Sequence, residues 1–329
     1  MKKIIFLSPI ILLFIVLGII GLLVLKRPEL ISPLPNIFSQ KTDLTPYSFE
    51  NLKKRQYYQS EIKLEGVLKE EEKFTSYLFS YSAEGKRITG MANLPKKEGK
   101  LPVAILLRGW VDEKDYYTGK GSDKMADFLA ENGFITLAPD FLGYGGSAQA
   151  FPDMLQTRFF RPITVISLLQ SLESLPQADI NKVVFWGHSN GGQIALTVLE
   201  ITERNIPTSL WAPVSAPFPQ SILHYTDELE DEGKLVKKIV VEFEKEYQSS
   251  HYSMTSYLDL VNAPLIIHQG TADEAIPLEW SENLVEKLRS LNKEITYYQY
   301  PGENHNFNRG NAQIVRNRDL RFFKDSLQI

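Results

Sequence analysis

The sequence predicts an α/β fold in which a mostly parallel central sheet carries helices on both faces. After residue 100, short apolar runs bounded by Gly, Pro or Asp alternate with helical patterns, as parallel strands joined by helices do. The 329 residues, of which 43% are hydrophobic, can bury the large core that this fold needs. The chain contains no cysteine, which excludes disulfides, thiolate metal sites and cysteine nucleophiles.

An apolar N-terminal segment predicts a transmembrane helix ahead of this domain. The chain is almost entirely apolar from Ile4 to Leu25, and Lys26 and Arg27 end the run. About 20 such residues cross a bilayer, and no small-residue cleavage site follows. We therefore expect residues 1–27 to be an uncleaved signal anchor of a single-pass membrane protein. Basic residues flank both ends, so charge sets the orientation only weakly; we expect the main domain outside the cytoplasm.

Residues 28–47 are expected to form a linker, because four prolines stand there among polar residues without periodicity. The main domain is then expected to span residues 48–329.

The order of the elements within this domain follows from the apolar patterns. The segments 61–70 and 74–95 predict opening antiparallel strands, with a turn at Glu84-Gly85. Buried strands are predicted within residues 101–110, 133–143, 182–189, 263–270 and 294–302. Helices are predicted at Ser122–Asn132, Thr157–Leu175, Gly192–Thr202, Leu278–Leu291 and Asn311–Leu327. In such sheets, ligands bind beyond the carboxyl ends of the strands.

Ser189 lies where a predicted strand ends and a predicted helix begins. Residues 187–191 match the pattern G-x-S-x-G, in which a strained turn exposes a serine oxygen and small residues let helix and strand pack closely. The N–H of Asn190, at the positive end of the helix, is expected to face a tetrahedral oxyanion. This pattern predicts that Ser189 is a nucleophile. The alternative is a glycine-rich turn with an incidental serine.

A serine nucleophile needs a base, and His305 is the predicted one. In folds with this turn an acid and then a histidine follow the serine along the chain. His305 lies in a loop directly after the last predicted strand. The other four histidines suit the role less well. His188 adjoins the serine, and His268 precedes the predicted acid along the chain. His224 and His251 lie in a charged insertion.

Asp273 is the predicted acid, because it follows the strand predicted within residues 263–270. Glu274 is its rival, and a turn-capping role for Asp273 is the alternative. In this interpretation His305 deprotonates Ser189, Asp273 orients the imidazole, and an acyl-enzyme forms and is hydrolysed.

Four blocks of sequence carry a resemblance to a known family. They are "LLRGW", "APDFLGYGGS", "ADINKVVFWGHSNGGQIAL" and the pair "YLDLVNAPLIIHQGTADEAIP" with "YPGENHNF". Over about residues 74 to 327 the chain resembles an α/β-hydrolase, most closely the catalytic domain of the prolyl oligopeptidase and dienelactone hydrolase group. The resemblance implies the same roles for Ser189, Asp273 and His305, and a backbone N–H as second oxyanion donor, for which Trp110 is our choice.

The chain departs from its relatives at one point of that site. Relatives usually carry His-Gly after the strand, whereas this chain has Arg108-Gly109. Arg108 either anchors the loop or reaches an anionic group of the substrate. A second familial loop is expected to be structural; its matching residues are Asp140, Gly143, Gly145 and Ser147.

The expected function is hydrolysis of a small peptide or ester by a membrane-anchored serine hydrolase. Too few residues precede the first matching strands for the β-propeller of full prolyl oligopeptidases, so an esterase is the alternative, followed by a non-catalytic binding module. An insertion at about 213–260 is the candidate lid. The net charge of −4 gives no basic excess for nucleic acid, and the chemistry needs no cofactor or metal. The oligomeric state is not predicted.

Overall fold

The computed structural model describes residues 42–229 and 231–329. The expected anchor at 1–27, and most of the expected linker, lie outside the described residues. One compact unit runs from Leu44 to Ile329. Leu44 and Tyr47 are buried in it, so the end of the expected linker packs on the folded domain. In the described part of the chain, no helix has the length and apolar character needed to cross a bilayer.

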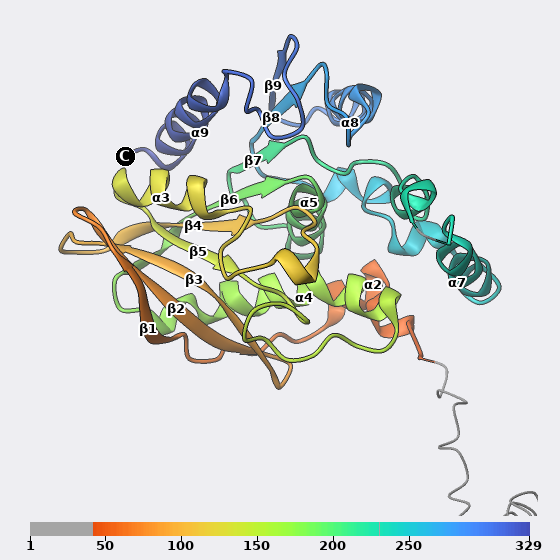
Figure 1. Cartoon of the computed structure of the whole chain (residues 1–329), viewed down its shortest axis with the longest axis horizontal. Helices are drawn as coiled ribbons and strands as arrows, with labels where there is room; N and C mark the ends of the chain where they lie inside the picture. The colour runs from red at the N-terminus through yellow and green to blue at the C-terminus, as the bar shows by residue number, and fades with distance from the viewer. Residues whose placement is uncertain (1–41, 230) are drawn as a thin grey trace, which may run out of the picture. The chain divides into compact units, whose positions relative to one another are not determined.

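Nine strands of the described chain form a single sheet in the order β1-β2-β3-β5-β4-β6-β7-β8-β9 (Figure 1). Their bounds are β1 Lys63–Glu70, β2 Phe74–Ala83, β3 Lys86–Pro95, β4 Leu101–Leu107, β5 Ile135–Pro139, β6 Ala178–His188, β7 Thr208–Trp211, β8 Leu265–Gly270 and β9 Ile295–Tyr300. The first three strands are antiparallel and β3 joins β5 in the antiparallel sense. From β5 to β9 all neighbours are parallel.

Helices cover both faces of the sheet. The bounds are α2 Phe49–Lys54, α3 Asp123–Glu131, α4 Met154–Ser171, α5 Asn190–Thr202, α6 Gln220–Leu223, α7 Lys234–Glu244, α8 Leu278–Ser290 and α9 Ala312–Leu327. One large apolar core contains residues of α4, α5 and α8, and a second core contains residues of α3 and α9. Figure 1 shows α3 and α9 on one side of the sheet, and α4 and α5 on the other. The predicted α/β fold is therefore confirmed.

The predicted elements correspond closely to those observed, with one strand missed. The turn between β2 and β3 lies at Glu84-Gly85, where both residues have positive φ. The missed strand is β7, which has four residues between Pro207 and Pro213. A run that short shows no periodicity. It nevertheless separates β6 from β8 in the sheet.

Parallel strands bring distant residues to one edge of the sheet. Gly109 lies just beyond β4, Ser189 follows β6, Asp273 lies just beyond β8 and His305 follows β9. Because these four strands run in the same direction, the residues that follow them emerge at the same edge.

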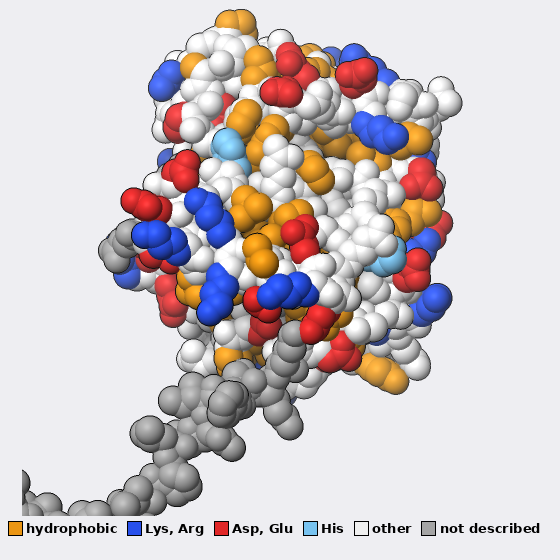
Figure 2. Space-filling view, turned by 90° about the vertical axis from the view of Figure 1, so that its right-hand side faces the viewer, with side chains coloured by type: hydrophobic (Ala, Val, Ile, Leu, Met, Phe, Trp, Pro, Cys, Tyr) orange, Lys and Arg blue, Asp and Glu red, His pale blue; other side chains and the backbone are white. Residues whose placement is uncertain are grey.

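The insertion at 213–260 forms α6, α7 and several short 3-10 turns. Phe243 of α7 packs against Phe159, Phe218 and Tyr252. Leu235 at the other end of α7 is 61% exposed, so only one end of the helix is held by the core. On the face shown in Figure 2, acidic, basic and apolar side chains are interspersed, without a single large patch of one sign.

Candidate active site

Ser189 has a backbone conformation that few non-glycine residues adopt. Its φ is 55° and its ψ is −118°, which is costly for a residue with a side chain. Backbone hydrogen bonds hold it there. The Ser189 N–H donates to the carbonyl of Trp211 at 2.9 Å, and the Ser189 carbonyl accepts from Gly192 and Val214 at 3.0 Å each. The turn is thus fixed by β7 and α5 together.

Helix α5 begins directly behind this serine and lies unusually close to β4. A Cβ atom on Gly191 would overlap the carbonyl oxygen of Leu107, so only glycine allows this approach. The close packing directs the N-terminal end of α5, with its unpaired N–H groups and partial positive charge, toward the space beside Ser189.

The loop after β4 supplies the other side of that space. A Cβ on Gly109 would stand 3.0 Å from Ser189 Cβ, so the loop and the turn are in contact. Trp110 and Asn190 line the same small cavity. Among the described residues, neither of their backbone N–H groups donates a hydrogen bond. Two free donors therefore border the serine.

Arg108 anchors the loop. It is 6% exposed, and its guanidinium carbon lies 4.1 Å from the ring centroid of Tyr144 and 4.5 Å from that of Tyr116. It also donates to the carbonyl oxygens of Gly109 and Asp140. Its charge lies against two aromatic rings. Of the two roles that the sequence left open for Arg108, these contacts support the anchoring of the loop.

Asp140 binds its neighbouring segments together, as expected for a structural loop. It is fully buried, and its carboxylate accepts hydrogen bonds from Thr89, Tyr116 and Thr118. Burial raises the pKa of Asp140, although these donors oppose the change.

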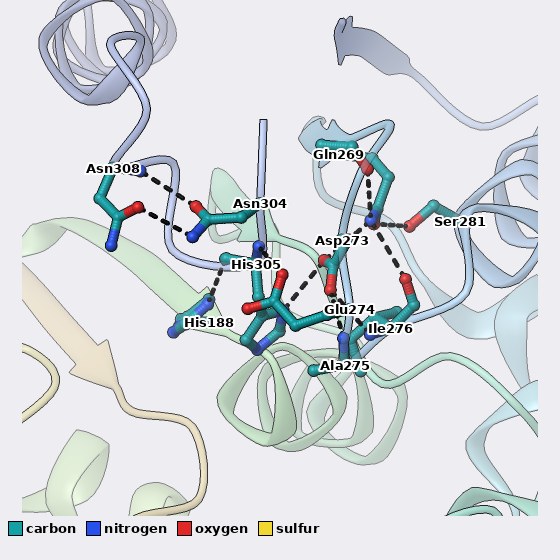
Figure 3. A network of polar contacts seen from close by, with 11 residues as sticks. His188, Gln269, Asp273, Glu274, Ala275, Ile276, Ser281, Asn304, His305 and Asn308 are labelled. Carbon is teal, nitrogen blue, oxygen red and sulfur yellow. Dashed lines mark hydrogen bonds and ion pairs between the residues drawn. The ribbon is translucent and has the colours of Figure 1, made fainter. Parts of the chain in front are cut away.

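His305 and Asp273 face each other from the loops after β9 and β8 (Figure 3). The His305 Nδ1–H donates to Asp273 Oδ2 at 2.9 Å. The other carboxylate oxygen, Oδ1, accepts from the N–H groups of Ala275 and Ile276. Burial alone would raise the pKa of Asp273, but the hydrogen bonds from His305 and these backbone groups outweigh it and lower the pKa. Asp273 is therefore an anion that fixes the imidazole.

Glu274 takes a different position from its neighbour. Its side chain is exposed and accepts a long hydrogen bond, 3.4 Å, from the backbone N–H of His305. Of the two carboxylates that the sequence left open, Asp273 contacts the imidazole. Ser189 Oγ and the His305 ring make no hydrogen bond in the described residues; such bonds often form only with substrate bound.

Two residues of this site have functions that the sequence did not indicate. The side-chain amide of Gln269 donates to Asp273 Oδ2 at 2.9 Å and its oxygen accepts from Ser281. Gln269 therefore helps to hold the carboxylate oxygen that the imidazole also contacts. Its position at the end of β8 is the only signal that could have marked it.

His188 is the second. Its Nε2–H donates to the carbonyl of His305 at 3.0 Å, and the two rings lie 4.5 Å apart. Burial, and then the neighbouring His305, lower the pKa of His188 to about 3, so it is neutral near pH 7 and serves as a support for the loop.

The remaining histidines lie elsewhere. His268 is fully buried between Asp319 and Tyr300, on the side of the sheet that α9 covers. His224 packs against Trp280.

The site combines a serine on a strained strand-to-helix turn with two free N–H donors and a paired histidine and aspartate at the same sheet edge. This arrangement defines the chain as a serine hydrolase of the α/β-hydrolase fold. Residues 121–329 match the family model described as "Prolyl oligopeptidase family". The chain belongs to the prolyl oligopeptidase family.

The chain is similar in sequence to peptidases and similar in fold to an esterase. The chain is 24% identical to "Uncharacterized peptidase YtmA" of Bacillus subtilis, over 74% of this chain and 93% of that one. It is 23% identical to "Dipeptidyl aminopeptidase BIII" of Pseudoxanthomonas mexicana, over 65% of this chain and 31% of that one. Acetyl xylan esterase 1 from Thermoanaerobacterium superposes with a TM-score of 0.61 at 16% identity, covering 84% of this chain and 93% of that one.

The low pKa of His188 makes a prediction about stability. The unfolded residue binds a proton below about pH 6.5, the folded one only below about pH 3. Between these values unfolding takes up a proton, so the contribution of His188 to stability is complete above pH 6.5 and is lost as pH falls. In urea titrations from pH 7 to 4.5, the free energy of unfolding of His188→Gln should fall less steeply than that of wild type.

His251 provides the control for this experiment, because it is exposed and His251→Gln removes one histidine without touching the site. Equal slopes for wild type and His188→Gln would contradict the burial of a neutral imidazole.

Proposed function

We propose that the chain is a membrane-anchored hydrolase that cleaves small peptide or ester substrates through an acyl-enzyme, with Ser189 as nucleophile, His305 as base and Asp273 as orienting acid. The observation that carries this assignment is the hydrogen bond between His305 Nδ1 and Asp273 Oδ2. Because Nδ1 holds the proton, Nε2 is left free to accept one. The proposal is supported by the emergence of both loops at the edge of the sheet where Ser189 lies.

These residues supply every proton transfer that the reaction needs. His305 Nε2 takes the proton of Ser189 Oγ as the oxygen attacks the substrate carbonyl carbon. The N–H groups of Asn190 and Trp110 stabilise the oxyanion. The intermediate then expels the amine or alcohol, which receives the proton from His305. Water then attacks the acyl-enzyme while His305 takes its proton. The second intermediate releases the carboxylic acid, and His305 returns the proton to Ser189 Oγ.

The insertion 213–260 contributes Tyr252 and Met254 to a cavity that Asn190 also lines, so this segment contributes to the choice of substrate. Hydrolysis of esters alone is the alternative. It is supported by the fold shared with acetyl xylan esterase 1.

The anchor is proposed from sequence. The apolar run from Ile4 to Leu25 has the length of a membrane span, and the compact unit begins at Leu44. About 20 residues then join the two, which leaves the domain free to work beside the bilayer, outside the cytoplasm.

Turnover of matched substrates tests the catalytic assignment. We expect wild type to release 4-nitrophenol from 4-nitrophenyl acetate, and Ser189→Ala to lower kcat by about 10⁴-fold or more. Asp273→Asn should lower it by about 10³- to 10⁴-fold, because the imidazole loses its orienting partner. Alanine 4-nitroanilide, measured in parallel, separates a peptidase from an esterase.

Ser290→Ala is the control, since Ser290 is an exposed serine at the end of α8 and its loss should leave kcat unchanged. Undiminished turnover by a folded Ser189→Ala protein would refute the assignment.

Membrane fractionation tests the anchor. The full chain should remain in the membrane pellet after alkaline carbonate extraction, whereas a chain from Leu44 onward should be soluble. In sealed, inside-out vesicles, added protease should spare the domain, because the domain then lies in the lumen. Release of the full chain by carbonate would exclude the anchor, and digestion of the domain would reverse the orientation.

A further inference from the structure

Two small cavities meet beside Ser189. One, of about 10 Å³, is lined by the loop after β4 and by Asn190; the other, of about 40 Å³, extends along α4 and α5. Asn190, Ile194 and Arg161 line both. An acyl group bound at Ser189 could therefore extend from the oxyanion donors past Arg161 into the second cavity.

The second cavity has a largely apolar wall, a few uncharged polar groups and two arginines, which are its only charged lining residues in the described chain. Its apolar and aromatic lining includes Phe49, Leu52, Phe159, Tyr252 and Met254. Arg158 and Arg161 lie three residues apart on α4, which places them on one face of the helix. No aspartate or glutamate lines either cavity.

The charge of these arginines is not neutralised by the protein. Arg158 donates only to uncharged groups, the side chains of Gln193 and Ser221. Among residues 42–229 and 231–329, nothing forms an ion pair or hydrogen bond with the guanidinium of Arg161. This differs from Arg108, whose guanidinium lies against two aromatic rings and donates to two backbone carbonyls.

The surroundings oppose both charges. Burial, and then the charge of Arg108, lower the pKa of Arg161 to about 10. Burial, and then the charge of Arg161, lower the pKa of Arg158 to about 9. Both groups remain charged at neutral pH. Both side chains are only partly buried. A cation that is partly removed from water without an anionic partner is still destabilised, and an anion in the cavity would reduce that cost.

The cavity lies on the acyl side of the scissile bond. The leaving group departs beside His305, which protonates it, and no residue of the loop 303–308 lines either of the two cavities. That loop instead borders a third, larger cavity through Asn306 and Asn308, together with His188. The leaving group is therefore assigned to the third cavity, and the acyl group to the cavities that contain Asn190.

Resting on the proposed function, we propose that the enzyme prefers short acyl groups that end in a carboxylate, and that Arg161, supported by Arg158, binds this carboxylate. The apolar walls contact the hydrocarbon stem, and the cavity of about 40 Å³ has room for about three water-sized groups, which limits the length of the chain.

A pair of esters with the same leaving group tests this proposal. The full chain is assayed with 4-nitrophenyl butyrate and with mono-4-nitrophenyl succinate, which differ at the end of the acyl chain. We expect a higher kcat/KM for the succinate. Arg161→Gln should lower the ratio of the two kcat/KM values, succinate over butyrate, by about 10- to 100-fold, mainly through the KM of the succinate. Arg161→Lys should keep part of the preference.

Arg289→Gln is the matched control, because Arg289 is an exposed arginine on α8 and its loss changes the net charge equally; the ratio should stay within about two-fold. An unchanged succinate-to-butyrate ratio of kcat/KM in folded Arg161→Gln would overturn the proposal. The proposed function would still stand in that case, provided that Ser189→Ala loses the hydrolysis of both esters.

If neither ester is hydrolysed, the proposed function fails, and ligand binding then tests the carboxylate site by itself. Free succinate at saturating concentration should raise the Tm of wild type and of Arg289→Gln, but not that of Arg161→Gln. Equal shifts in all three proteins, or no shift in any, would overturn the proposal.

Discussion

The hydrogen bond from the Ser189 N–H to the carbonyl of Trp211 is the constraint on which the rest of the site depends. It joins the turn after β6 to the end of β7, and it holds a φ of 55° that the serine would otherwise leave. Strand β7 is itself paired with β8, whose end carries Asp273. One short strand thus links Ser189 to the strand that precedes Asp273. Any change that shifts β7 would move both.

A second line of support runs through the loops. His188 is adjacent to Ser189 and donates to the carbonyl of His305, so the serine and the histidine are tied through one side chain. Asp273 is fixed by four donors, from the backbone of Ala275 and Ile276, from His305 and from Gln269. Because each group is held by neighbours that are themselves packed, the arrangement is preorganised, and substrate binding need not assemble it.

The fold could be predicted because short apolar strands alternate with longer helical patterns, and glycine, proline or aspartate residues bound most of the strands. The pattern around Ser189 and the order of acid and histidine likewise marked the residues that emerge at one edge. Strand β7 could not be found, because four residues carry no period. The supporting roles of His188 and Gln269 depend on contacts between segments far apart in the chain, as do the unpaired charges of Arg158 and Arg161. Such contacts leave no local signal in the sequence.

The central claim is that Ser189 is an activated nucleophile, and covalent trapping tests it most directly. The full chain is incubated with a fluorophosphonate at pH 7, and the product is examined by intact-protein and peptide mass spectrometry. Our account predicts one adduct per chain, located on Ser189, because its hydroxyl combines a strained strand-to-helix turn with a base on a neighbouring loop. An adduct on another residue, or a chain that remains unmodified while folded, would contradict the account.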